Sequence, residues 1–195
     1  NRRAQVLQVF QWVPGLGTQI REARLFLETG LHFARGSRAV LQGYTPVVQA
    51  LGASGTQADL LALRENLETA APLFQEALAE LAKARESRER LGTPDGLGDR
   101  MREPLELIDQ YVPLVELAAV TAIETPELVG EVLSLRDTLS SLRVTLSEPA
   151  AFLENPQTLQ AAFADVEERA QRVQEGILRV KSAIDSDNEK ANQAL

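Results

Sequence analysis

The chain has 195 residues, of which 44% are hydrophobic and only 5% aromatic, and its formal net charge is -8. It has no cysteine and one histidine, which excludes thiolate catalysis, a disulfide framework, and zinc-finger or iron–sulfur sites. The acidic balance argues against a general nucleic-acid binder, because binding a phosphate backbone needs an excess of lysine and arginine.

Leucine and alanine dominate the composition, which favours helices, and a chain of this length predicts one folded domain over residues 1–195. A short amphipathic lead-in is expected over 1–17, ending at the Pro14-Gly15-Leu16-Gly17 break. The first long helix is expected from Thr18 toward Leu51. Its inward face is predicted to hold Ile20, Leu27, Leu31, Ala34, Leu41, Val48 and Leu51.

The second long helix is expected from Thr56 to about Leu91, where Thr56 and Asp59 have the spacing of a capping box. Its seam is predicted to hold Leu60, Leu63, Leu67, Ala70, Phe74, Leu78, Leu81 and Ala84. A flexible loop follows over 92–104, where glycine and proline are frequent.

The third rod is predicted to begin near Leu105 and to be interrupted near Thr125, because Thr125-Pro126-Glu127 resembles a helix start. Asn155 and Pro156 repeat that signal before the last helix, whose apolar residues alternate steps of four and three as in a coiled coil. The polar tail over 186–195 is expected to fray. Pro46, Pro72 and Pro113 fall inside helical patterns and are interpreted as kinks, with helix starts as the alternative.

These elements predict an all-α fold: an elongated antiparallel four-helix bundle with coiled-coil-like heptad packing. The pattern offers no enzyme chemistry. Glu28 and His32 stand four residues apart without a second histidine, so no di-iron site is expected. No serine lies in a nucleophile elbow, and the carboxylates fall mostly outside the apolar seams, so no catalytic residue, metal or cofactor is assigned.

One stretch of the first helix is less regular than the rest, because it carries Gly30, Gly36 and Gly43. A ligand-binding groove there would use His32, Arg35, Arg38 and Tyr44, with an arginine on an anionic group and the tyrosine closing over it. Tight helix packing explains the glycines equally well. The basic cluster from Lys83 to Arg102 is interleaved with acids and predicts a solvated bundle end, with an anion or polymer contact as the alternative.

The run Val13-Pro-Gly-Leu-Gly-Thr-Gln-Ile-Arg-Glu-Ala-Arg24, followed by a long Ala/Leu helix, resembles the extracytoplasmic helical region of a bacterial family of unknown function. The resemblance is carried by these residues and by composition beyond them. In that family a single N-terminal transmembrane helix precedes the helical region and a larger envelope-facing domain follows it. The resemblance therefore implies a membrane-anchored, cell-envelope protein whose anchor lies outside this chain, and it supplies no catalytic residue.

The expected function is a non-catalytic extracytoplasmic module, a stalk, scaffold or interaction domain with a protein partner or a second copy on its helical faces. One alternative is a four-helix sensor domain that binds a small ligand between helices. Another is an exchangeable lipid-binding helical protein, which the acidic charge and low aromatic content disfavour. Neither nucleic acid nor direct membrane contact by this chain is expected.

Overall fold

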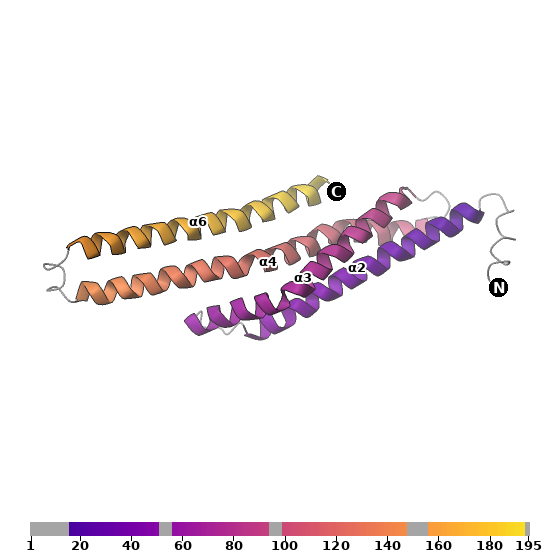
Figure 1. The fold of residues 1–195 in the computed structure, drawn as a ribbon. Coiled ribbons are helices and arrows are strands. Elements are labelled where there is room, and N and C mark those ends of the chain that lie inside the picture. The colour runs from indigo at the N-terminus through magenta and orange to yellow at the C-terminus, as the bar shows by residue number, and fades with distance from the viewer. Residues whose placement is uncertain (1–15, 51–55, 94–98, 148–155, 194–195) are drawn as a thin grey trace. The chain divides into compact units, whose positions relative to one another are not determined.

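The computed structural model describes residues 16–50, 56–93, 99–147 and 156–193, and all of these except Thr56, Gly92 and Thr93 are helical. Four helices follow one another along this part of the chain (Figure 1). They are α2 (Leu16–Ala50), α3 (Gln57–Leu91), α4 (Asp99–Ser147) and α6 (Pro156–Gln193). The all-α helical bundle predicted from the sequence is confirmed.

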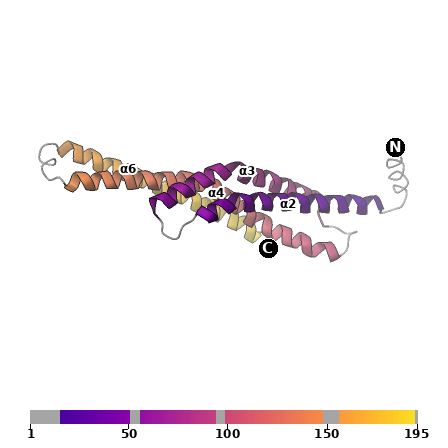
Figure 2. The ribbon, with the colours of Figure 1, turned by 90° about the horizontal axis from the view of Figure 1, so that it is seen from below.

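Successive helices pack side by side in opposite directions. Leu25 near the start of α2 clusters with Leu91 at the end of α3, while Gly36 further along α2 lies against Leu81. In the same way Arg88 of α3 meets Asp109 of α4, and Glu127 of α4 meets Arg179 of α6. Turned by 90°, the ribbon again shows α6 running beside the second half of α4 (Figure 2).

The chain divides into two compact units. The first unit contains α2 as far as Leu41, α3 from Gln75 onward, α4 as far as Ala119, and α6 from Asp187. The second contains the remaining parts of the same helices, from Gln42 to Phe74 and from Val120 to Ser186. All four helices thus contribute residues to both units.

The core of the first unit is built from α2, α3 and α4 together. Leu25, Leu91 and Leu105 form one buried cluster, against which Phe26 packs. Leu81, Ile108 and Val112 form a second cluster, covered by Phe33 and Val115. Burying each of these aliphatic side chains stabilises the fold by about 1.5–3 kcal/mol relative to leaving it in water.

In the second unit, Phe74 on α3 is fully buried. The ring of Tyr44 from α2 meets it edge-on, with centroids 5.1 Å apart. On the other side of this unit α6 approaches α4 at Gly176, where an added Cβ would lie 2.9 Å from Cδ1 of Leu128. The small residue therefore sets how closely these two helices pack.

The predicted helix starts at Thr56 and Pro156 are confirmed. The Thr56 amide and hydroxyl both donate to Oδ2 of Asp59 at 2.8 Å, and the Asp59 amide donates back to the hydroxyl at 3.3 Å. This reciprocal arrangement satisfies amides that the first turn leaves without partners. Helix α6 begins at Pro156, whose fixed φ and missing amide hydrogen suit the first helical position. Pro46, Pro72 and Pro113 lie inside helices, so they are not helix starts.

The interruption predicted near Thr125 is wrong, because α4 continues through it as a single helix of 49 residues (Figure 1). The hydroxyl of Thr125 donates to the carbonyl of Thr121 at 2.6 Å, so it bonds back into its own helix instead of capping a new one. Pro126 is buried inside this helix, although proline has no amide hydrogen and the helix therefore lacks one backbone hydrogen bond there.

Three predicted boundaries also shift. Helix α2 includes Leu16 and Gly17, which were expected to belong to the lead-in over 1–17. The rest of that lead-in lies outside the described residues. The loop expected over 92–104 gives way to α4 at Asp99, and Gly92, with φ of +60°, ends α3 in the left-handed conformation that glycine adopts freely. The tail expected to fray over 186–195 is helical as far as Gln193.

The inward face predicted for α2 is also wrong, although the helix itself is present. The described members of that face are exposed, with Leu27 at 67% and Leu41 at 69% of their full accessibility, and Leu51 lies outside the described residues. A neighbouring face is buried instead, and it carries small and polar residues among its aliphatics. Its members are Glu22, Leu25, Thr29, Gly36, Ala39, Val40, Gly43 and Val47.

Candidate functional site

Gly36 and Gly43 of α2 lie at close contacts between helices and not in an open groove. A Cβ on Gly36 would lie 2.8 Å from Cγ of Leu81 and 3.2 Å from the carbonyl oxygen of Ala77. A Cβ on Gly43 would lie 2.7 Å from Cζ of Phe74. A Cβ on Gly30 would have no neighbouring atom within 4 Å outside its own stretch of helix. Tight packing, the alternative reading of the sequence, therefore accounts for Gly36 and Gly43.

The four predicted site residues fall into different surroundings. His32 and Arg35 approach one carboxylate, that of Glu80 on α3, with Nδ1 at 2.8 Å and Nη1 at 3.8 Å from Oε2. Arg38 is exposed on α2. Tyr44 belongs to the second unit, where burial raises the pKa of its hydroxyl and its ring contacts Phe74. The structure thus brings two of the four together, around an acid that the sequence analysis did not single out.

Glu80 is a buried carboxylate that joins α2 and α3. Nζ of Lys83, one turn along α3, lies 2.5 Å from Oε1, and His32 occupies Oε2. Hydrogen bonds from Lys83 and then from His32 lower the pKa of Glu80 below its ordinary value of 4.5, against the opposing effect of burial. Because both oxygens accept from fixed donors, this carboxylate is suited to holding two helices together and offers no free base.

A second charged group lies between α3 and α4 in the first unit. Nε of Arg88 is 3.0 Å from each carboxylate oxygen of Asp109, and Nη1 donates to the carbonyl of Gly92 at 2.7 Å. One turn earlier, Nη2 of Arg85 pairs with Glu116. These arginines belong to the basic cluster that the sequence placed in solvent, and their spacing of three residues puts both toward α4.

A cavity of about 340 Å³ opens beside these ion pairs, and we call it the α3–α4 cavity. Its walls come from α3 and α4 alone. They are Ala84, Arg85, Arg88, Ile108, Asp109, Val112 and Pro113. The combination of an apolar floor with a few convergent charged groups is typical of small-molecule sites.

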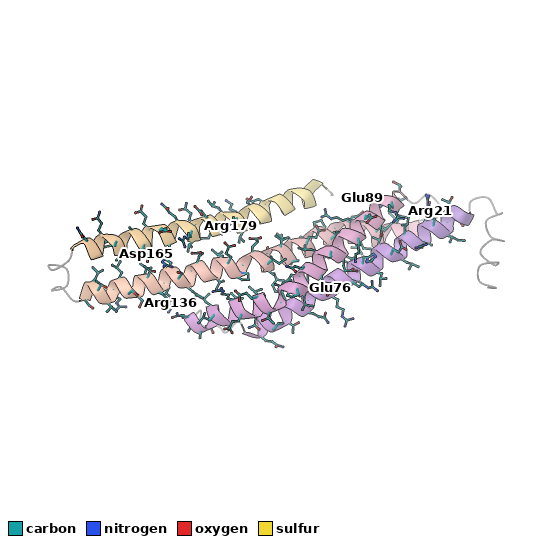
Figure 3. The ribbon with its side chains drawn as sticks, in the orientation of Figure 1. Arg21, Glu76, Glu89, Arg136, Asp165 and Arg179 are labelled. Atoms are coloured by element: carbon teal, nitrogen blue, oxygen red, sulfur yellow. The ribbon has the colours of Figure 1, made fainter. Side chains whose placement is uncertain are left out.

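The second unit carries grooves between α4 and α6 whose walls are largely charged or hydroxyl-bearing. One contains the ion pair of Arg179 with Glu127, at 2.9 Å. Another contains Arg169, which binds Asp165 at 3.0 Å and also contacts Ser134. Figure 3 labels Asp165 and Arg179 on α6. Among the described residues no three histidine, aspartate or glutamate side chains gather as a metal site would require.

An apolar stripe runs along the exposed side of α2 in the first unit, and we call it the α2 stripe. It consists of Ile20, Leu27, Leu31 and Leu41, each at least 44% exposed, with Ala34 between them. The spacing follows a heptad, the pattern by which one helix packs on another. The sequence analysis found this pattern but assigned it to the core of the chain.

Comparison with models of protein families, with curated proteins and with solved structures finds no match to this chain. Within the described ranges, no helix combines the length and the apolar character needed to cross a bilayer.

Proposed function

We propose that the chain is a non-catalytic helical interaction module of a larger, membrane-anchored bacterial protein. The observation that carries the interaction role is the α2 stripe. Four large aliphatic side chains on one helix face, at heptad spacing and exposed, form a surface that a partner helix would cover. Covering them would stabilise a complex by removing apolar area from water.

The charges beside the stripe indicate the kind of partner. Arg21, Arg24, Arg35 and Arg38 of α2 are all exposed. The two acids of this stretch add little negative charge to the exposed surface, since Glu28 accepts from Arg24 at 2.8 Å and Glu22 is buried. The surface is thus apolar with basic flanks, and like charge disfavours a second α2 as its occupant. We expect a partner helix with a heptad apolar face flanked by aspartate or glutamate.

The test uses two synthetic helical peptides of about four heptads, both with leucine at the core positions. One carries glutamate at the flanking positions and the other lysine, and binding to the whole chain is followed by fluorescence anisotropy. We expect the glutamate peptide to bind at least about tenfold more tightly than the lysine peptide. Equal binding of the two, or no binding of either, would overturn the proposal.

A matched pair of variants locates the contact. The double substitution Leu27→Gln and Leu41→Gln changes the stripe, and Leu107→Gln with Val144→Gln changes two other exposed aliphatic residues, both on α4. Only the first pair is expected to weaken the glutamate peptide, by about tenfold or more. If both pairs weaken it alike, the contact does not lie on the stripe.

The anchored, extracytoplasmic part of the proposal rests on the resemblance of residues 13–24 described above. It is tested on the native protein in its source cells, detected with an antibody against this chain. A species much larger than 21.3 kDa that resists carbonate extraction supports the anchored module. A species near that mass that carbonate releases contradicts it.

A second candidate function is a sensor domain that binds a small ligand between helices. The α3–α4 cavity favours it, because its volume of about 340 Å³ falls in the range of small-molecule sites. Its location differs from the groove expected near His32 and Tyr44. Thermal stabilisation of the chain by a compound, lost when the cavity is altered, would support this function.

A further inference from the structure

The floor of the α3–α4 cavity is apolar and belongs to the core of the first unit. Ala84 is fully buried, and Ile108 and Val112 belong to the core cluster around Leu81. Pro113 completes this side and is itself buried. An engineered cavity of roughly 150 Å³ holds benzene. A volume of about 340 Å³ therefore accommodates one ring or a short branched chain together with a small head group.

Arg85 supplies hydrogen-bond donors at the edge of this floor. Its pair with Glu116 uses Nη2, so Nε and Nη1 can donate to a ligand. Its side chain is 41% exposed, which leaves it accessible from solvent. Because α4 already holds the guanidinium in place, little further side-chain entropy is lost when it binds an anion.

Arg88 has the opposite role. Asp109 accepts from its Nε and Nη2, and the carbonyl of Gly92 accepts from Nη1, so its nitrogens are engaged. Each arginine is paired with one acid, Arg88 with Asp109 in the cavity wall and Arg85 with Glu116 beside it. A ligand with several negative charges would meet both carboxylates, whereas a single negative charge can be matched by Arg85 alone.

We infer that the α3–α4 cavity binds a small organic monocarboxylate, with its apolar body against Ile108 and Val112 and its carboxylate on Arg85. This names the ligand class for the second candidate function and rests on it. The carboxylate would accept from Nε and Nη1 of the guanidinium in the side-by-side geometry that arginine favours. The body would displace water from an apolar surface.

The experiment titrates the isotope-labelled chain with 3-phenylpropanoate and, separately, with its neutral amide, and follows methyl and amide NMR signals. We expect the acid to shift the signals of Ala84, Ile108 and Val112 and to bind at least about tenfold more tightly than the amide. Equal or tighter binding of the amide at the same residues would overturn the carboxylate class while supporting a ligand-binding cavity. Scattered shifts, or none with either compound, would overturn both.

Three variants give results of different sign. Arg85→Gln removes the donor and is expected to weaken the acid by about tenfold, without changing the amide. Glu116→Gln removes the competing carboxylate and is expected to tighten the acid severalfold. Arg64→Gln is the matched control, since Arg64 is also on α3, paired with Glu68 and similarly exposed, but lies outside the cavity. Unchanged affinity in Arg85→Gln, or a decrease in Glu116→Gln, would refute the proposed contact.

Discussion

His32 and Glu80 link α2 to α3 through a single contact in which Nδ1 of the imidazole lies 2.8 Å from Oε2 of the carboxylate. Since a carboxylate accepts, the ring carries its proton on Nδ1. Nζ of Lys83 lies 2.5 Å from the other oxygen, so this buried acid of α3 has one partner on α2 and one on its own helix. This relationship leads to a prediction about pH.

Replacing Glu80 by glutamine is expected to lower the free energy of unfolding at pH 7 by about 1–3 kcal/mol, because charged hydrogen bonds are lost. The pKa of Glu80 is lowered by Lys83 and His32, so the folded chain binds its proton less readily than the unfolded chain. The stabilisation is therefore present above the ordinary value of 4.5 and is lost as pH falls through the lowered pKa. Urea unfolding at pH 7 and pH 3 should show the difference from wild type shrinking in acid.

The control for this prediction is Glu76→Gln, one turn earlier on α3 and exposed (Figure 3). It should change stability by less than about 0.5 kcal/mol at either pH. A difference for Glu80→Gln that stays constant between the two pH values would contradict the role given to its charge.

Gly36→Ala is expected to destabilise the first unit. The new methyl group would meet Cγ of Leu81 and the backbone of Ala77, neither of which is the free end of a flexible side chain. Overpacking costs about 1–3 kcal/mol, more than the about 1 kcal/mol that alanine gains over glycine in a helix. Gly30→Ala has open space around its Cβ and should gain that helix propensity. Chemical denaturation of both variants measures the two signs, and equal effects would exclude the close contact at Gly36.

Leu25 lies on the face of α2 that is buried in the structure, and Leu27 lies on the face that the heptad pattern predicted to be buried. Leu25 is 5% exposed and Leu27 is 67% exposed. Leu25→Ala should therefore lower the free energy of unfolding by about 2–5 kcal/mol, whereas Leu27→Ala should change it by less than about 0.5 kcal/mol. The reverse order in denaturation experiments would show that the stripe is the buried face of the chain.

Thr56→Ala is expected to cost about 0.5–2 kcal/mol, because its hydroxyl accepts from the Asp59 amide at the start of α3. Thr93→Ala, just beyond the end of the same helix, serves as the control. Thermal unfolding followed by circular dichroism measures both. A loss in Thr93→Ala as large as that in Thr56→Ala would argue against a specific contribution of the cap.

The sequence predicted what local chemistry determines. Most of the predicted seam of α3 is confirmed, since Leu67, Ala70, Phe74, Leu81 and Ala84 are buried and Leu60, Leu63 and Leu78 are half-buried. So are the capping box at Thr56 and the proline at the start of α6. In each case the signal lies within one turn or along one helix face, where spacing alone decides the outcome.

The failures occur where neighbouring helices decide. Periodicity finds the more hydrophobic face of α2, yet α3 packs on the face where Gly36 and Gly43 let it approach. Thr125 and Pro126 are residues typical of a helix start, but Thr125 bonds back to Thr121 within α4 and Pro126 is buried there. Glu80 is linked to α2 by His32, and Arg85 is linked to α4 by Glu116; no spacing within one helix reveals partners on another helix.

The glycine at position 36 also limits how α2 can move along α3. Leu81 occupies the place that a Cβ would take, so sliding α2 by one turn, about 5.4 Å, would bring His32 or Val40 opposite Leu81. Both have side chains that need this space, and the helices would have to separate before they could slide. Within the first unit, a signal carried by piston-like translation of α2 against α3, or by rotation of α2 about its own axis, is therefore opposed by steric exclusion, whereas bending of α2 about this contact leaves the glycine in place.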